Sequence, residues 1–428
     1  MKKNVVWSVA GNLYYAFCQW LILLVIAKLG GPLMVGQFSL GLVMTAPIII
    51  FFNFSLRLIQ ATDTKQEYTF REYVKLRLWS MVAALAVIVL FAFISGYDST
   101  TVLIISFIGI AKAFEATSEV YYGKFQKEEK MDIISKSMFL KGTFSIVCVF
   151  IGVYITGSVL WGTVGLAVAW LSVLFFYDSK KGRMTNTEAE IQTLPEEQGS
   201  AKRLFMLVRK ALPLGIVSLL ISVNLNIPRY VIENQLGTYE LGIFSAIAYF
   251  MLFNSIPINA VGQSASSRLS RYYVEHVSGF RKLLSKLAIF GLLFGSVGIA
   301  LTLLAGNGLL HALYGKEFAE QDVLLVWLMV AATIGNVESI LWYGVTAAQY
   351  FKVQLPVFIC VNVLTLISCV VLVPRYGLIG AAVSVTAVAF IQLLMTFTIN
   401  VYSLRTKRKS SASQQQGIGE PKSALSVE

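Results

Sequence analysis

The stretch VVWSVAGNLYYAFCQWLILLVIA, residues 5–27, contains no charged side chain. As a helix it would be about 35 Å long at 1.5 Å per residue, which is enough to cross the ~30 Å hydrocarbon core of a bilayer. The stretch is too long for the apolar region of a cleavable signal peptide, and it contains Asn12 and Gln19. We therefore expect it to form the first membrane span and to be kept in the mature protein.

Similar apolar runs recur from one end of the chain to the other. Hydrophobic residues make up 56% of the 428 residues and charged residues only 14%, and the mean hydropathy is +0.70. A soluble protein of this length could not cover its surface with so few charges. The sequence therefore predicts an all-α polytopic membrane protein. Its twelve expected transmembrane helices lie near residues 5–27, 33–56, 74–95, 101–122, 133–155, 158–177, 207–228, 236–262, 283–304, 322–347, 355–373 and 378–400.

The basic side chains predict the orientation of these helices. If the N-terminus lies in the cytoplasm, 29 of the 35 Lys and Arg residues fall in inner segments and four in outer segments, while Lys112 and Lys141 lie inside spans. Such an excess on the cytoplasmic side is typical of membrane proteins. We expect a multi-pass protein of the bacterial cytoplasmic membrane with both termini in the cytoplasm. The net charge of +12 then needs no nucleic-acid partner.

The two halves of the chain resemble each other. LGGPLMVGQFS (29–39) matches LGTYELGIFS (236–245), and the resulting offset of 206 residues pairs Asn53 with Asn259. Two similar halves in the same orientation are parallel repeats, a common design of transporters that hold substrate between the halves.

The repeat, together with a long polar inner loop, divides the chain into four parts. We expect an N-terminal six-helix bundle over residues 1–178, a cytoplasmic linker loop over 179–206, a C-terminal six-helix bundle over 207–404 and a disordered cytoplasmic tail over 405–428. The tail is expected to be disordered because its composition is polar and of low complexity.

Three ionisable side chains, Lys112, Glu115 and Glu119, lie in the expected span at residues 101–122. Spacings of three and four place them on one face of a helix. A charge facing lipid near the midplane costs about 2.5–3.5 kcal/mol on insertion scales, so this face should meet protein or a watery cavity. Either Lys112 and Glu115 pair and hold the helix against a neighbour, or the three line a cavity for a polar substrate or a coupling ion. Solvation near the cytoplasmic end is the main alternative for Glu119.

Other polar side chains in or next to the spans extend the candidate substrate cavity. A single Asn in a span is usually a hydrogen-bonding group between helices, but Asn53 and Asn259 occupy equivalent positions in the two halves. Glu338 lies in the span equivalent to the one with the charged face, so Glu115, Glu119 and Glu338 are candidates for ion coupling. The remaining cavity candidates are Arg57, Asn224, Asn226, Arg229 and Gln263.

The two arginines have alternative explanations. Either could bind phosphate, since a guanidinium group presents a planar fork of donors. Arg57 could equally extend to the inner interface, and Arg229 could pair with Glu233.

No motif of a known enzyme class is present. The sequence lacks GxxxxGK[ST], GxSxG and HExxH, and its four cysteines lie in expected spans without a CxxC pair. We therefore expect a transporter and not an enzyme, with no catalytic residue, no metal site and no cofactor.

Five stretches resemble the polysaccharide flippases of the multidrug/oligosaccharidyl-lipid/polysaccharide exporter superfamily. The resemblance covers residues from about 4 to 400. The stretches are LGGPLMVGQFS (29–39), RLIQATDTKQEYTFREYVKLR (57–77), YYGKFQKEEKMD (121–132), NIPRYVIENQLGTYELGIFSAIAYF (226–250) and GQSASSRLSRYY (262–273).

This resemblance implies a flippase that works by alternating access. Its substrate would be a polyprenyl-pyrophosphate-linked oligosaccharide of a capsule, O-antigen or exopolysaccharide pathway, moved from the cytoplasmic to the outer leaflet. Its partners would be that lipid-linked oligosaccharide, bilayer lipids, and a glycan polymerase and assembly proteins. The alternatives are an ion-coupled drug exporter of the same superfamily, a membrane-embedded glycan polymerase or acyltransferase, and a non-catalytic scaffold for glycan assembly.

Overall fold

The computed structural model describes residues 2–63, 67–184, 200–350 and 353–417. Within these ranges every regular element is a helix, and no strand is present. The elements are α1 (Lys2–Asn53), α2 (Leu56–Thr62), α3 (Phe70–Ile94), α4 (Ser99–Lys127), α5 (Met131–Thr156), α6 (Val159–Val173), the π-helix η1 (Leu174–Asp178), α7 (Ser179–Met184), α8 (Ser200–Leu236), α9 (Thr238–Glu275), α10 (Val277–Leu313), α11 (Lys316–Ala319), α12 (Asp322–Ala347) and α13 (Gln354–Gly417).

Ten helical segments of the described residues are long and apolar enough to cross a membrane. Two of them, Val6–Thr62 and Gln354–Lys407, are more than twice the length that one crossing needs. Each is interrupted by a glycine with positive φ, Gly31 at 65° and Gly377 at 59°. Glycine adopts this conformation without steric penalty, so each glycine divides its helix into two spans. The described residues therefore contain twelve crossings, which confirms the predicted fold class.

Three expected connections differ in the structure. The connection between the expected spans at 283–304 and 322–347 is largely helical, because α10 continues to Leu313 and α11 follows. The linker expected at 179–206 is helical at both ends, where α7 and α8 extend into it, and its centre at 185–199 lies outside the described residues.

The tail is the third difference. The chain was expected to be disordered from Arg405, but α13 continues to Gly417. Residues 405–416 contain neither Pro nor Gly and include Lys, Arg, Ala and Gln, which favour continuation of an existing helix.

The chain divides into two compact units. Unit 1 comprises Met1–Tyr249, Asn307–Asp322 and Thr365–Ala381, and unit 2 comprises Phe250–Gly306, Val323–Leu364 and Ala382–Glu428. The domain boundaries at residues 178 and 207 stay a prediction.

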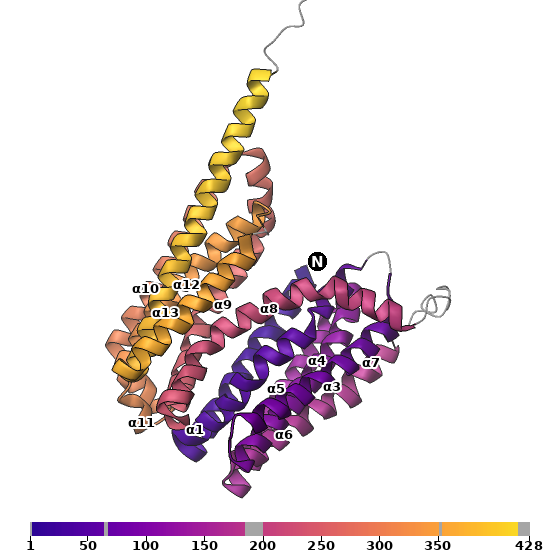
Figure 1. The fold of residues 1–428 in the computed structure, drawn as a ribbon, viewed down its shortest axis with the longest axis vertical. Helices are drawn as coiled ribbons and strands as arrows, with labels where there is room; N and C mark the ends of the chain where they lie inside the picture. Colours follow the sequence, from indigo (N-terminus) through magenta and orange to yellow (C-terminus); the bar gives the residue numbers. More distant parts are fainter. Residues whose placement is uncertain (1, 64–66, 185–199, 351–352, 418–428) are drawn as a thin grey trace, which may run out of the picture. The chain divides into compact units, whose positions relative to one another are not determined.

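In unit 1, helices α1, α4, α5 and α6 pack side by side (Figure 1). Trp170 of α6 and Phe125 of α4 are fully buried there, as are Ile22 and Ile26 of α1. In unit 2, a second core joins Ile258 and Leu269 of α9 with Phe280, Ile340 and Leu404.

The start of α9 crosses α1 at two glycines within unit 1. A methyl group built on Gly36 would overlap the Thr238 carbonyl group, and one built on Gly242 would overlap the Pro32 carbonyl group. Gly36 and Gly242 are 206 residues apart, and so are Pro32 and Thr238, so the contact is reciprocal between repeat-equivalent residues. Reciprocal contacts are what a two-fold relation between similar halves produces.

Candidate functional site

The charged face of α4 lies in the interior of unit 1. The Lys112 ammonium group contacts Glu115 Oε2 at 2.8 Å and lies 4.9 Å from the centre of the Trp170 ring. The Tyr15 hydroxyl of α1 donates to the other oxygen of Glu115. The Lys112 and Glu115 side chains are each 24% exposed, so this ion pair is only partly buried.

The C-terminal part of the same face of α4 receives side chains from the end of α1 and from α2. Asn53 Nδ2 donates to Glu119 Oε2 at 2.8 Å. Arg57 Nε donates to Gln126 Oε1 at 3.1 Å, and its guanidinium carbon lies 5.5 Å from the centre of the Tyr122 ring. The structure therefore places two separate pairs, Lys112 with Glu115 and Asn53 with Glu119, along one face of α4. Arg57 contacts two further side chains of the same helix.

The sequence analysis missed a buried ion pair in unit 1. Lys141 Nζ of α5 lies 3.3 Å from Asp178 Oδ2 of η1, and the two side chains are 2% and 0% exposed. The Tyr122 hydroxyl accepts a hydrogen bond from Lys141 at 3.0 Å. Because a π-turn shifts the helical register, η1 orients Asp178 toward α5 instead of toward the linker. The available signal was a carboxylate directly after an apolar run.

Arg77 was also missed, because it was counted among the basic residues of an inner loop. In the structure it lies two turns inside α3 and is completely buried. None of its three side-chain nitrogens has a hydrogen-bond partner among the described residues. The Glu119 carboxylate is the opposite charge that acts on it.

The predicted residues of α8 form hydrogen bonds with α13 or with the backbone of α8 itself. Asn224 accepts a hydrogen bond from Thr365 at 2.8 Å, so it joins two helices of unit 1. Asn226 and Arg229 donate to carbonyl groups one turn earlier in α8 itself. Glu233 accepts from Thr238, and no ion pair between Arg229 and Glu233 occurs in the described ranges.

Unit 2 holds the remaining predicted residues. Glu338 Oε1 of α12 accepts hydrogen bonds from Gln392 at 3.0 Å and Thr396 at 3.2 Å. Ser339, its neighbour in sequence, donates to Asn259 Oδ1 at 2.8 Å, so the Asn259 side chain joins α9 to α12. The Gln263 side chain is exposed on α9.

No group of three or more His, Cys, Asp or Glu side chains that could hold a metal ion occurs in the part of the chain that the structure describes.

A family model described as "Polysaccharide biosynthesis protein" matches residues 1–267 of this chain. The chain belongs to this family. The capsular polysaccharide biosynthesis protein CapF of Staphylococcus aureus is 31% identical over 411 residues, which are 92% of this chain and 98% of CapF. The resemblance predicted from the sequence is thus confirmed.

Solved structures show that this member of the polysaccharide biosynthesis protein family has the fold of the MOP superfamily. A multidrug resistance MATE family transporter in the inward-facing conformation matches with a TM-score of 0.76 at 14% identity, over 94% of this chain and 96% of that one. The outward-facing conformation of such a transporter gives 0.60 at 16% identity, over 95% and 97%. A MOP superfamily transporter from Pyrococcus furiosus gives 0.59 at 14% identity, over 94% and 96%.

These side chains of unit 1 give this polysaccharide biosynthesis protein a charged and hydrogen-bonding interior. Lys112 and Arg57 supply cations, while Asn53 supplies an amide group. Such groups bind phosphate oxygens and sugar hydroxyls.

Proposed function

We propose that the protein is a flippase that moves a polyprenyl-pyrophosphate-linked oligosaccharide from the cytoplasmic to the outer leaflet by alternating access. The observation that carries this proposal is the 31% identity to a capsular polysaccharide biosynthesis protein over nearly its full length, in a chain with the MOP fold. A glycan assembled on a lipid in the cytoplasm must cross the membrane, and the polar head group cannot cross the hydrocarbon core unaided. We place the protein in the bacterial cytoplasmic membrane with both termini in the cytoplasm.

Three cations are our candidates for the pyrophosphate: Lys112, Arg57 and Arg229. The geometry of Arg57 supports its inclusion most directly. Only its Nε is engaged, by Gln126, and its two terminal nitrogens have no hydrogen-bond partner within the described ranges. A free pair of parallel N–H donors matches two phosphate oxygens. The amide side chains of Asn53, Asn224, Asn226, Asn259 and Gln263 are our candidates for the sugar hydroxyls.

The partners of the three acidic candidates differ in a way that favours Glu338 as the group that couples transport to protons. Glu115 pairs with Lys112, and Glu119 lies near Arg77. Glu338 receives only neutral donors, and no ionised group of the described residues acts on it. A carboxyl group without a cation partner can bind and release a proton without breaking an ion pair.

Glu338→Gln should therefore keep the fold and abolish the pH dependence of transport, while Glu115→Gln should lose substrate binding and keep the pH dependence. Equal pH dependence in the wild type and Glu338→Gln would contradict the assignment.

Deletion of the gene tests the proposed function. We expect complete lipid-linked repeat units to accumulate on the cytoplasmic side, and expression of the chain to restore surface glycan. A drug-sensitivity phenotype with normal surface glycan would favour the exporter of small molecules instead. Accumulation of repeat units on the outer side would favour a polymerase.

Lys112→Ala separates the two explanations of the charged face. Loss of transport in a variant that folds and melts like the wild type supports a substrate-binding role. Loss of folding supports a purely structural ion pair.

A further inference from the structure

The N-terminal part of α8 is longer than a membrane span requires. The apolar helical segment Lys202–Leu236 contains 35 residues and is about 52 Å long at 1.5 Å per residue. The hydrocarbon core is about 30 Å thick, so roughly two fifths of the segment lies outside it. Pro213 lies at this point of the helix and interrupts its backbone hydrogen bonding. Residues 202–212, called here the α8 N-terminal segment, therefore lie next to the bilayer boundary.

One face of this segment packs against the apolar side chains of α2 and α3. Leu207 and Ala211 are fully buried in a cluster with Leu56 of α2 and Tyr73 of α3, and Leu204 packs against it.

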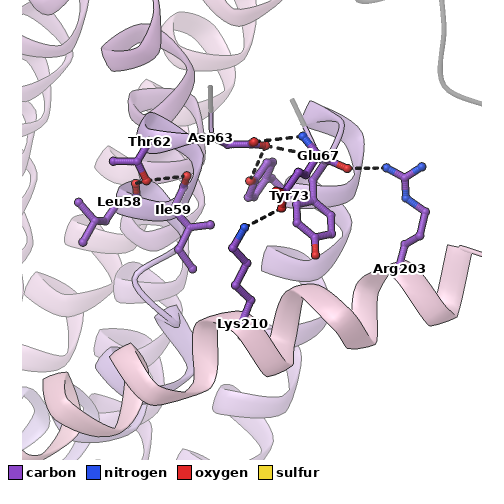
Figure 2. Close-up of polar contacts among 9 residues, drawn as sticks. Leu58, Ile59, Thr62, Asp63, Glu67, Tyr73, Arg203 and Lys210 are labelled. Carbon is purple, nitrogen blue, oxygen red and sulfur yellow. Dashed lines mark hydrogen bonds and ion pairs between the residues drawn. The ribbon is translucent and has the colours of Figure 1, made fainter. Parts of the chain in front are cut away.

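Ion pairs hold a second face of the segment. Arg203 Nε contacts Glu72 Oε1 at 2.7 Å, and Arg203 also donates to the Glu67 carbonyl oxygen at 2.8 Å. Lys210 contacts Glu67 Oε2 at 2.6 Å (Figure 2). Asp63, at the end of α2, accepts hydrogen bonds from the Glu67 amide group and the Tyr73 hydroxyl.

The face that remains combines exposed apolar and basic side chains. Phe205 is 68% exposed, and Met206 and Leu212 are also exposed. Lys202 and Arg209 are exposed and have no hydrogen bond or ion pair with any residue that the structure describes. Spacings of three and four residues place five side chains on one side of the helix: Lys202, Phe205, Met206, Arg209 and Leu212. This combination is characteristic of helices that lie in the membrane interface.

We propose that this face binds anionic phospholipids of the adjacent leaflet. Lys202 and Arg209 bind phosphate groups, while Phe205, Met206 and Leu212 insert among the upper parts of the acyl chains. The segment continues directly into a membrane span after Pro213, so it cannot leave the interface. Lipid phosphate groups at this boundary are therefore anions within reach of Lys202 and Arg209, which have no ion-pair partner among the described residues.

The test measures retention of phosphatidylglycerol and of phosphatidylcholine by the delipidated full-length protein, using native mass spectrometry. The wild type should prefer phosphatidylglycerol. The double variant K202Q/R209Q should bind phosphatidylglycerol about thirty-fold more weakly. This factor corresponds to ~2 kcal/mol at 1.4 kcal/mol per tenfold change, or about 1 kcal/mol for each basic residue removed. Phe205→Ser should weaken binding of both lipids.

Lys210→Gln is the matched control, since it removes the same charge from the same segment at a residue that Glu67 already neutralises. It should change phosphatidylglycerol binding by less than about threefold. The proposal fails if K202Q/R209Q retains phosphatidylglycerol like the wild type, or if Lys210→Gln weakens it as much as the double variant does. Unchanged melting temperatures establish that all variants are folded when compared.

Discussion

Gly242→Ala should destabilise the crossing of α1 and α9. A methyl group on this residue would lie 2.7 Å from the Gly36 nitrogen and closer still to the Pro32 carbonyl oxygen. Carbon–oxygen contacts between helices are normally at least about 3.3 Å, so the two helices must separate. Overpacking of this kind costs about 1–3 kcal/mol, and the better helix propensity of Ala returns about 0.5–1 kcal/mol. We expect a net loss of about 1–2 kcal/mol.

The assay is thermal unfolding of the purified protein in detergent, with Gly335→Ala as the matched control. Nothing lies within 4 Å of a methyl group built on Gly335, which is inside α12. That substitution should leave the melting temperature unchanged or raise it. Gly36→Ala should behave like Gly242→Ala, because the contact is reciprocal. A Gly242→Ala protein that melts at or above the wild-type temperature would refute the reasoning.

Three further predictions concern charged groups of unit 1. Asp178→Asn should destabilise the protein by about 3–5 kcal/mol because it leaves Lys141 buried without its counter-charge, whereas the double variant K141M/D178L should recover most of the loss in a double-mutant cycle. Asp98→Ala should cost about 1 kcal/mol by removing the N-cap of α4. The hydrogen bond from Thr101 lowers the pKa of Asp98 below its value in the unfolded chain, so this contribution is complete at neutral pH and is lost as the pH falls below about 4. Arg77→Met should leave the melting temperature unchanged or raise it, since no nitrogen of the buried guanidinium group has a hydrogen-bond partner in the described residues; a clear fall would show that the attraction to Glu119 outweighs the cost of burying Arg77.

The sequence predicted the spans and the repeat because both depend on average properties of long segments. Twelve apolar runs identify twelve crossings. The offset of 206 residues that paired Asn53 with Asn259 also pairs Gly36 with Gly242. These two glycines lie next to each other in the structure. Spans can be predicted from hydropathy without knowing which helices are neighbours.

Individual contacts were harder to predict because they join residues far apart in the sequence. The Lys112–Glu115 pair was one of two alternatives, since its spacing of three lies within one helix. The bond from Asn53 to Glu119 crosses between helices and could not be predicted from either helix alone. Arg77 and Asp178 lie near span boundaries, where an uncertainty of a few residues decides whether a charge is solvated or buried.

The most direct test of the central claim is translocation by the purified protein in liposomes that contain a polyprenyl-pyrophosphate-linked oligosaccharide. We predict that the wild type moves the oligosaccharide to the opposite leaflet, where an added lectin detects it, and that folded Lys112→Ala does so far more slowly. Wild-type protein that leaves the lipid-linked oligosaccharide in its original leaflet at the rate of empty liposomes would contradict the account.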